Sequence, residues 1–153
     1  MTRDPLVTSR IMGAIKNRNT GPELVLRYEL HRRGLRYRLR SRLTGHPDLV
    51  FPRSRVVVFV DGDYWHGNTW LLRGATSFEA YCAGRANSEF WRAKITGNIR
   101  RDAEVTQALE ERGWTVVRLW ESDILKDLTA AAVRVETAVR ADGRRVNRDA
   151  NAA

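Results

Sequence analysis

The fold is decided by two neighbouring stretches, Gly45-His46-Pro47-Asp48-Leu49-Val50-Phe51 and Val56-Val57-Val58-Phe59-Val60-Asp61-Gly62-Asp63-Tyr64-Trp65-His66. The short, β-branched apolar runs with a turn between them predict two adjacent strands, the second covered on both faces. Each strand delivers an aspartate, Asp48 or Asp61, to one end of the predicted sheet, with His66 just beyond.

Carboxylates gathered in this way hold hard divalent cations such as Mg²⁺, and a nearby imidazole can take a proton from a metal-associated water. Each residue also has a structural interpretation. Asp48 follows a turn, Asp61 precedes Gly62 in an Asp-Gly turn signal, and a lone histidine such as His66 is usually structural. Taken together, the three predict a metal-dependent nuclease.

A helix is predicted before these strands. Thr20 is a suitable N-cap, Pro22 fits the first turn, Glu23 completes a Thr-x-x-Glu capping box, and Gly34 is a natural stop. The capping box explains Glu23 fully, yet a helix that begins beside the sheet end could also turn this side chain towards the metal. The sequence leaves both interpretations open.

Segment 35–40 alternates strictly between apolar residues and arginines, which predicts a further strand. The apolar residues Leu35, Tyr37 and Leu39 are expected to be buried, with Arg36, Arg38 and Arg40 facing out together.

The second half of the chain predicts a long helix from Asn87 or Ser88 to about Arg112, a strand over 114–120 and a final helix over about 123–140. A strand after a helical crossover usually lies parallel to its neighbour. The predicted fold is therefore α/β, with a mixed four-stranded central sheet flanked by helices. Residues 67–86 show no reliable period and are expected to form a loop.

Length predicts one domain over 1–141, with a basic N-terminal arm or helix at about 1–19 and a polar, disordered tail over 142–153. The formal charge is +9, from 27 basic and 18 acidic residues, which makes nucleic acid the natural partner. The single cysteine, Cys82, fits a reducing cytoplasm. The sequence offers neither a secretory signal nor a membrane-spanning run, so we expect a cytoplasmic protein with no membrane partner.

From about Ser9 to Trp120 the chain resembles the very-short-patch-repair (Vsr) mismatch endonucleases of the PD-(D/E)xK nuclease superfamily. The matching motifs are Ser9-Arg10-Ile11-Met12, Ala14-Ile15, Thr20 to Glu23, Gly45 to Asp48, Phe59 to His66, Glu89 to Ile95, Asn98 to Asp102, and Gly113-Trp114 through Glu121. The resemblance implies a restriction-endonuclease-like αβββαβ core. It also implies an enzyme that nicks double-stranded DNA beside the thymine of a T:G mismatch, using Mg²⁺ with Mn²⁺ as a substitute.

The resemblance also implies roles for single residues. Asp48 matches the central metal-binding aspartate, the Val60 carbonyl a metal ligand, His66 the general base, and Glu23 an acid near the site. The aromatic wedge that enters DNA matches Tyr64, Trp65 and Trp91. The basic residues expected to hold DNA are Arg10, Lys16, Arg18, Arg36, Arg38, Arg40 and Lys94.

Two departures from the family pattern matter. Asp61 stands where well-known members have histidine and where the superfamily has lysine, and Phe59 replaces the second acid. Asp61 can bind metal or orient water, but it supplies no cation. Second, Asp63, Asn68 and Ser122 stand near the positions of the structural-zinc ligands of many relatives, so we expect no structural zinc and a loop held by packing.

Three alternatives remain open at this stage. A PD-(D/E)xK nuclease of other specificity, in restriction or defence, would share the same catalytic residues. A catalytically inactive DNA-binding protein is compatible with the changes at Phe59 and Asp61. An RNA-associated basic protein would leave Asp48, Asp61 and His66 unexplained. We expect a monomer.

Overall fold

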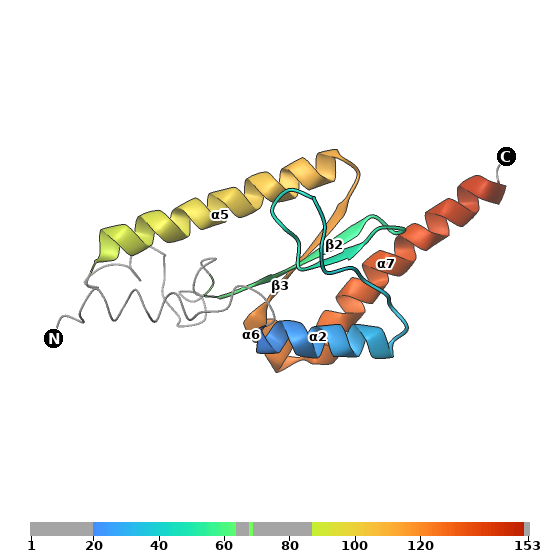
Figure 1. The fold of residues 1–153 in the computed structure, drawn as a ribbon, viewed down its shortest axis with the longest axis horizontal. Helices are drawn as coiled ribbons and strands as arrows, with labels where there is room; N and C mark the ends of the chain where they lie inside the picture. Colours follow the sequence, from blue (N-terminus) through green and yellow to red (C-terminus); the bar gives the residue numbers. More distant parts are fainter. Residues whose placement is uncertain (1–19, 64–67, 69–86, 152–153) are drawn as a thin grey trace.

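The computed structural model describes residues 20–63, 68 and 87–151, and for 142–151 it gives only the course of a helix. Its elements in chain order are α2 (Gly21–Arg32), β1 (Leu49–Phe51), β2 (Val56–Asp61), α5 (Ser88–Glu111), β3 (Thr115–Trp120), α6 (Glu121–Lys126) and α7 (Leu128–Asn151) (Figure 1). The fold is α/β, as the sequence predicts.

The sheet has the order β1-β2-β3, so β2 is its central strand. β1 runs antiparallel to β2, with Leu49 opposite Val58. β3 runs parallel to β2, with Asp61 opposite Trp120. The parallel strand after the α5 crossover confirms the prediction of a mixed sheet.

Helices cover both faces of this sheet (Figure 1). On one face, α2, α6 and α7 pack over a core that includes Leu26, Val58 and Leu119. On the other face, α5 packs through Leu109 against the side chains of Val57 and its neighbours. Burial of β2 on both faces explains why its apolar run is continuous rather than alternating.

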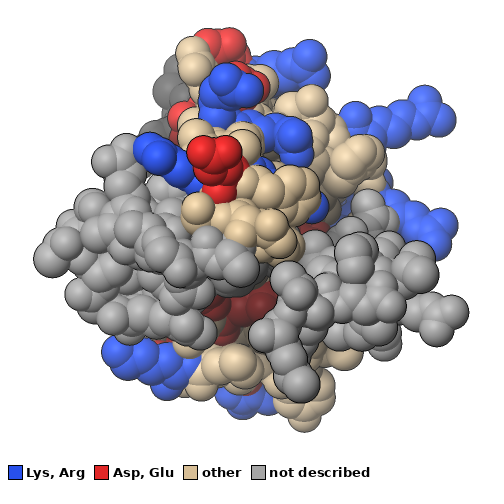
Figure 2. Space-filling view, turned by 90° about the vertical axis from the view of Figure 1, so that its left-hand side faces the viewer, with Lys and Arg blue, Asp and Glu red and all other residues tan. Residues whose placement is uncertain are grey.

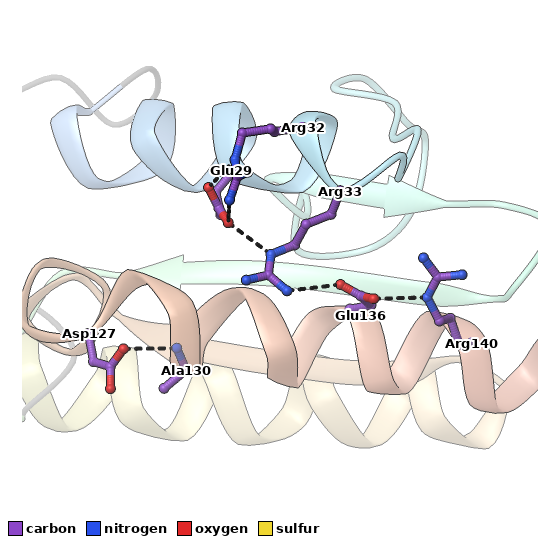
Figure 3. Close-up of polar contacts among 7 residues, drawn as sticks. All are labelled: Glu29, Arg32, Arg33, Asp127, Ala130, Glu136 and Arg140. Atoms are coloured by element: carbon purple, nitrogen blue, oxygen red, sulfur yellow. Dashed lines mark hydrogen bonds and ion pairs between the residues drawn. The ribbon is translucent and has the colours of Figure 1, made fainter.

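Helix α2 begins and ends where the sequence predicts. The Thr20 side chain accepts a hydrogen bond from the Glu23 backbone N–H at 3.4 Å, and Gly34 takes the positive φ of 83° that ends the helix. Polar contacts then tie α2 to α7. Arg33 bonds Glu29 on its own helix at 2.9 Å and Glu136 on α7 at 3.2 Å (Figure 3).

The predicted strand over 35–40 forms only an isolated bridge. Arg38 and Val50 exchange two backbone hydrogen bonds, at 2.8 and 2.9 Å. Leu35 is buried and Tyr37 packs on the α2-side core, but Leu39 is 43% exposed, against expectation. Burial of the side chains alternates from Leu35 to Arg38, but the segment pairs with β1 only at Arg38. Within the described residues the sheet therefore has three strands, and the predicted fourth is not confirmed.

The C-terminal helical region also differs from prediction. Helix α6 starts at Glu121 and ends before Asp127, which interrupts the helical region. The Asp127 carboxylate then caps α7 by accepting a hydrogen bond from the Ala130 N–H at 3.0 Å (Figure 3). Helix α7 continues to Asn151, past the expected end near Arg140, with no proline to stop it. The division into a nuclease domain and a tail stays a prediction. Within the described part of the chain, no helix is long and apolar enough to cross a membrane.

Candidate active site

Asp48 lies immediately before β1, at the edge where β2 continues towards Asp61. Its backbone N–H donates to the Val58 carbonyl at 2.9 Å, which extends the strand pairing by one residue. Its carboxylate Oδ2 accepts the Val60 N–H at 2.7 Å. The central strand thus holds both the backbone and the side chain of Asp48.

The electrostatic surroundings of Asp48 raise its pKa to about 6 from an ordinary 3.8. Burial is the largest cause, and the Val60 hydrogen bond opposes it. The negative charges of Glu23 and Asp61 raise the pKa further, and the nearby Arg27 guanidinium lowers it. The fold therefore gathers three carboxylates from α2, the β1 edge and the end of β2.

Glu23 takes part in the helix cap through its backbone, and the charge of its side chain acts on Asp48. Its backbone N–H takes part in the Thr20 cap, while its side chain is 3% exposed and carries one of the charges that act on Asp48. Arg27, one turn later on α2, forms an ion pair with Glu23. Among the described residues, Nε of Arg27 is a buried donor without a hydrogen-bond partner.

Asp61 is paired with a cation that the sequence reasoning missed. Nη1 of Arg118, on β3, donates to both carboxylate oxygens of Asp61, at 3.0 and 3.1 Å. The same guanidinium donates to the Thr106 hydroxyl at 2.9 Å and the Asp102 carbonyl at 3.2 Å, both on α5. Its Cζ lies 4.2 Å from the centre of the Phe59 ring. Arg118 therefore joins the end of β2 to α5.

These residues fit a divalent cation at Asp48 better than at Asp61. A cluster of three negative charges with a destabilised Asp48 carboxylate is a suitable environment for a cation, and Mg²⁺ needs only one or two carboxylates besides water. Asp61, by contrast, already shares its charge with Arg118. Within the described residues, no group of three or more His, Cys, Asp and Glu side chains is arranged to hold a metal by itself.

A second polar cluster joins the chain just after β2 to the start of α6. The Asp63 carboxylate accepts hydrogen bonds from Asn68 Nδ2 at 2.7 Å, from the Ser122 hydroxyl at 2.6 Å and from the Ser122 N–H at 3.0 Å. The Asn68 N–H also donates to the Asp63 carbonyl at 2.7 Å. These three residues stand near the positions where the family pattern implies structural-zinc ligands. Hydrogen bonds thus fix Asn68 to Asp63.

The expected DNA-contacting residues fall into separate groups. Trp91 and Lys94 lie near the start of α5, where Phe90 is 5.1 Å from the Trp91 ring and 6.0 Å from the Lys94 ammonium. Arg38 and Arg40 are exposed beyond the end of α2. Arg36 is exposed too, but its guanidinium donates to the His31 carbonyl at 2.9 Å.

The remaining predicted residues lie outside the described part of the chain. They are Arg10, Lys16, Arg18, Tyr64, Trp65 and His66. On the side where β2 ends and α2 and α5 begin, Figure 2 shows acidic atoms deep in the centre and Lys and Arg atoms around the periphery.

Two partners of the site carboxylates, Arg27 and Arg118, escaped the sequence reasoning. Arg27 had a detectable signal, since it stands four residues after Glu23 on a predicted helix. Arg118 is the lone charge in an otherwise apolar or β-branched strand. That pattern indicates that the arginine forms an ion pair within the fold, but it does not identify the acidic partner.

Comparison with known proteins adds independent information. The family described as "DNA mismatch endonuclease Vsr" matches residues 2–72. The Type II nicking enzyme V.NmeDIP of Neisseria meningitidis serogroup C is 43% identical over 137 residues, spanning 89% of this chain and 88% of that protein. The Type II nicking enzyme V.HpaIIP of Haemophilus parainfluenzae is 37% identical over 125 residues, 81% of this chain and 84% of that protein. DNA mismatch endonuclease Vsr of Escherichia coli K12 is 34% identical over 119 residues, 77% and 71% of the two chains.

Proposed function

The chain belongs to the Vsr family of DNA endonucleases, and from this premise we propose that it nicks one strand of duplex DNA at T:G mismatches, as in very short patch repair. The enzyme is a phosphodiester hydrolase with DNA as its substrate. The observation that supports this site is Asp48, fixed by the Val60 N–H and surrounded by the charges of Glu23 and Asp61.

We propose that Asp48 and the Val60 carbonyl hold Mg²⁺, with Mn²⁺ as a substitute. The cation supplies charge stabilisation on the scissile phosphate and on a bound water. The Val60 N–H orients the Asp48 carboxylate by its hydrogen bond at 2.7 Å. Arg118 donates hydrogen bonds to both carboxylate oxygens of Asp61, so we assign Asp61 a supporting role beside the metal.

The remaining roles follow from the sequence. His66 is the proposed general base that takes a proton from the attacking water. Tyr64, Trp65 and Trp91 are the proposed wedge, which exchanges base stacking for a bent duplex. The basic residues neutralise backbone phosphates, so binding should weaken steeply with salt. Because one site cuts one strand, we propose that the protein acts as a monomer.

The decisive experiment compares two labelled duplexes that differ only in a T:G or a T:A pair, with Mg²⁺ or with EDTA. We expect one nick beside the mismatched thymine, only with metal, and its loss in Asp48→Asn. Equal nicking of the T:A duplex would refute mismatch specificity, and wild-type nicking by Asp48→Asn would refute the metal site.

A second specificity is favoured by the relatives named Type II nicking enzymes, whose names mention no mismatch. Under this alternative the enzyme would nick another mismatch or a matched sequence with the same residues. A panel of all single mismatches in several flanking sequences separates the two functions. An inactive DNA binder would bind the same duplexes and nick none with either Mg²⁺ or Mn²⁺.

A further inference from the structure

Two arginines lie at the carboxylates of the candidate site, and they differ in how fully their donors are used. Every nitrogen of the Arg118 guanidinium donates a hydrogen bond, Nη1 to Asp61 and the other two to groups on α5. Among the described residues, Arg27 donates to Glu23 alone, through Nη2. Its Nε is a buried donor that no acceptor in this part of the chain meets.

Arg27 is a nearly buried cation with hydrogen bonds left to make. Its side chain is 13% exposed, against 23% for Arg118. A buried donor without an acceptor costs free energy, and in native structures such a group calls for a completing partner such as a water, an ion or a ligand. The guanidinium of Arg27 therefore has donors available for a ligand, and the exposed remainder of its side chain is where that ligand would make contact.

The surroundings of Arg27 indicate the chemistry of such a ligand. Glu23 and Arg27 stand one turn apart on α2, and the positive charge of Arg27 acts on the Asp48 carboxylate. An anion that approaches the three carboxylates of the site is repelled unless cations offset them. A guanidinium presents a planar fork of donors that matches the paired oxygens of a phosphate group. A DNA phosphodiester that reaches Asp48 therefore meets a cation with unused donors.

We propose that Arg27 is a catalytic residue that donates hydrogen bonds to a non-bridging oxygen of the scissile phosphodiester, while its ion pair with Glu23 holds the guanidinium at the site. This inference rests on the proposed nicking of DNA at this site. Arg27 stabilises the negative charge of the phosphate as water attacks phosphorus and the bond to the leaving oxygen breaks. The guanidinium keeps its protons throughout, and hydrolysis consumes one water to give a phosphate monoester and a hydroxyl group.

A double-mutant cycle between Arg27 and single phosphates tests this contact in EDTA, without cleavage. A methylphosphonate, which is neutral, replaces one phosphate at a time around the T:G pair, and fluorescence anisotropy measures the affinity of wild type and of Arg27→Met for each duplex. Repulsion by the site carboxylates acts in both proteins and cancels in the cycle. We expect a coupling of about 10- to 100-fold at one phosphate, the size of a hydrogen bond between charged groups. It should be the phosphate that is hydrolysed with Mg²⁺.

Two further variants separate the contact from effects on folding. Arg27→Lys keeps a positive charge beside Glu23 and loses the planar fork, so its cycle should give a smaller coupling at the same phosphate. If Arg27→Met does not fold, the Arg27→Lys cycle decides, and no coupling at any phosphate would then overturn the inference. The matched control is Arg33→Met, because Arg33 follows the same helix and bonds Glu29 and Glu136. It should couple to no phosphate and nick at the wild-type rate.

Single-turnover nicking with Mg²⁺ completes the comparison. We expect Arg27→Met to nick about 100-fold more slowly, as when one transition-state donor is removed, and Arg27→Lys to recover part of the rate. Slow nicking by Arg27→Met without coupling to any phosphate would overturn the inference, because Arg27 would then act only by holding Glu23. Nicking by Arg27→Met at the wild-type rate would overturn it too. If the wild type nicked no T:G duplex, the proposed function would fail, while a phosphate coupled to Arg27 would still establish the contact.

Discussion

Both carboxylate oxygens of Asp61 accept hydrogen bonds from one nitrogen, Nη1 of Arg118, at 3.0 and 3.1 Å. The two residues are 57 positions apart and meet because β2 and β3 are parallel neighbours. The Asp61 side chain is 8% exposed and that of Arg118 is 23% exposed. Removing the cation would leave a nearly buried charge without this partner.

We therefore expect Arg118→Leu to lower the free energy of unfolding by about 3 kcal/mol, in the range found when one member of a buried ion pair is removed. Urea denaturation at pH 7.5 measures the change. The control is Arg100→Leu, which breaks the exposed Arg100–Glu104 pair on α5 and should cost at most about 1 kcal/mol. Equal effects of the two substitutions would contradict a structural role for the Asp61–Arg118 pair.

Asp48 makes stability depend on pH in a defined direction. Its pKa is about 6 in the folded protein against 3.8 as the ordinary value, so the folded state binds more protons between these limits. Stability must then fall as pH rises from about 4 to 6, by about 2 to 3 kcal/mol for this group. Asp48→Asn removes the charge and keeps an acceptor for the Val60 N–H.

Asp48→Asn should accordingly be more stable than wild type at pH 7.5, and the difference should shrink as pH falls towards 4. Urea denaturation of both proteins across this range, in EDTA, isolates the contribution of Asp48 from the other acids. A variant less stable than wild type at pH 7.5 would mean that the Asp48 charge is well compensated in the folded state.

Two glycines should respond to alanine in opposite ways. Gly45 has a φ of +77°, and a Cβ there would clash with Cγ1 of Val105 on α5. Gly45→Ala should cost about 2 to 4 kcal/mol from left-handed strain and overpacking. Gly97, inside α5, has open space around its Cβ position, so Gly97→Ala should gain about 1 kcal/mol.

Thermal melting of the two variants gives the comparison. Adding Val105→Ala to Gly45→Ala should recover the part of the loss that comes from overpacking. If stability did not recover, the whole loss in Gly45→Ala would come from backbone strain in the turn before Asp48.

DNA affinity should report which exposed arginines contact phosphate. Arg38→Ala and Arg40→Ala should each reduce the slope of log affinity against log salt by about 0.9, the value for one lost phosphate contact. Arg36→Ala should change it less, because its guanidinium already bonds the His31 carbonyl. Arg134→Ala on α7 is the exposed control. Fluorescence anisotropy across a salt series measures all four slopes.

Local signals made much of the architecture predictable. Thr20 and Gly34 bounded α2 because caps act within a few residues, and the apolar run of β2 was recognisable because both its faces are buried. The expected strand over 35–40 failed, because alternation does not reveal whether a partner continues beside it. The pairing of Asp61 with Arg118 could not be predicted, because it depends on how two strands far apart in the sequence align.

The position of Asp48 was predictable from its place before a strand, but its raised pKa was not. That shift needs the charge of Glu23 from a separate helix and burial that only the assembled fold creates. Sequence pattern thus located the central carboxylate, while its chemistry arises from tertiary contacts.

The bond between Arg33 and Glu136 has a consequence for the order of synthesis. Helix α2, which carries Glu23, bonds to α7, which is translated about a hundred residues later. The central strand β2 likewise lacks its neighbour β3 until that strand has been translated. A nascent chain halted after β2 therefore has its acidic groups without the framework that aligns them. We therefore expect nicking activity to arise only after β3 and α7 have been translated.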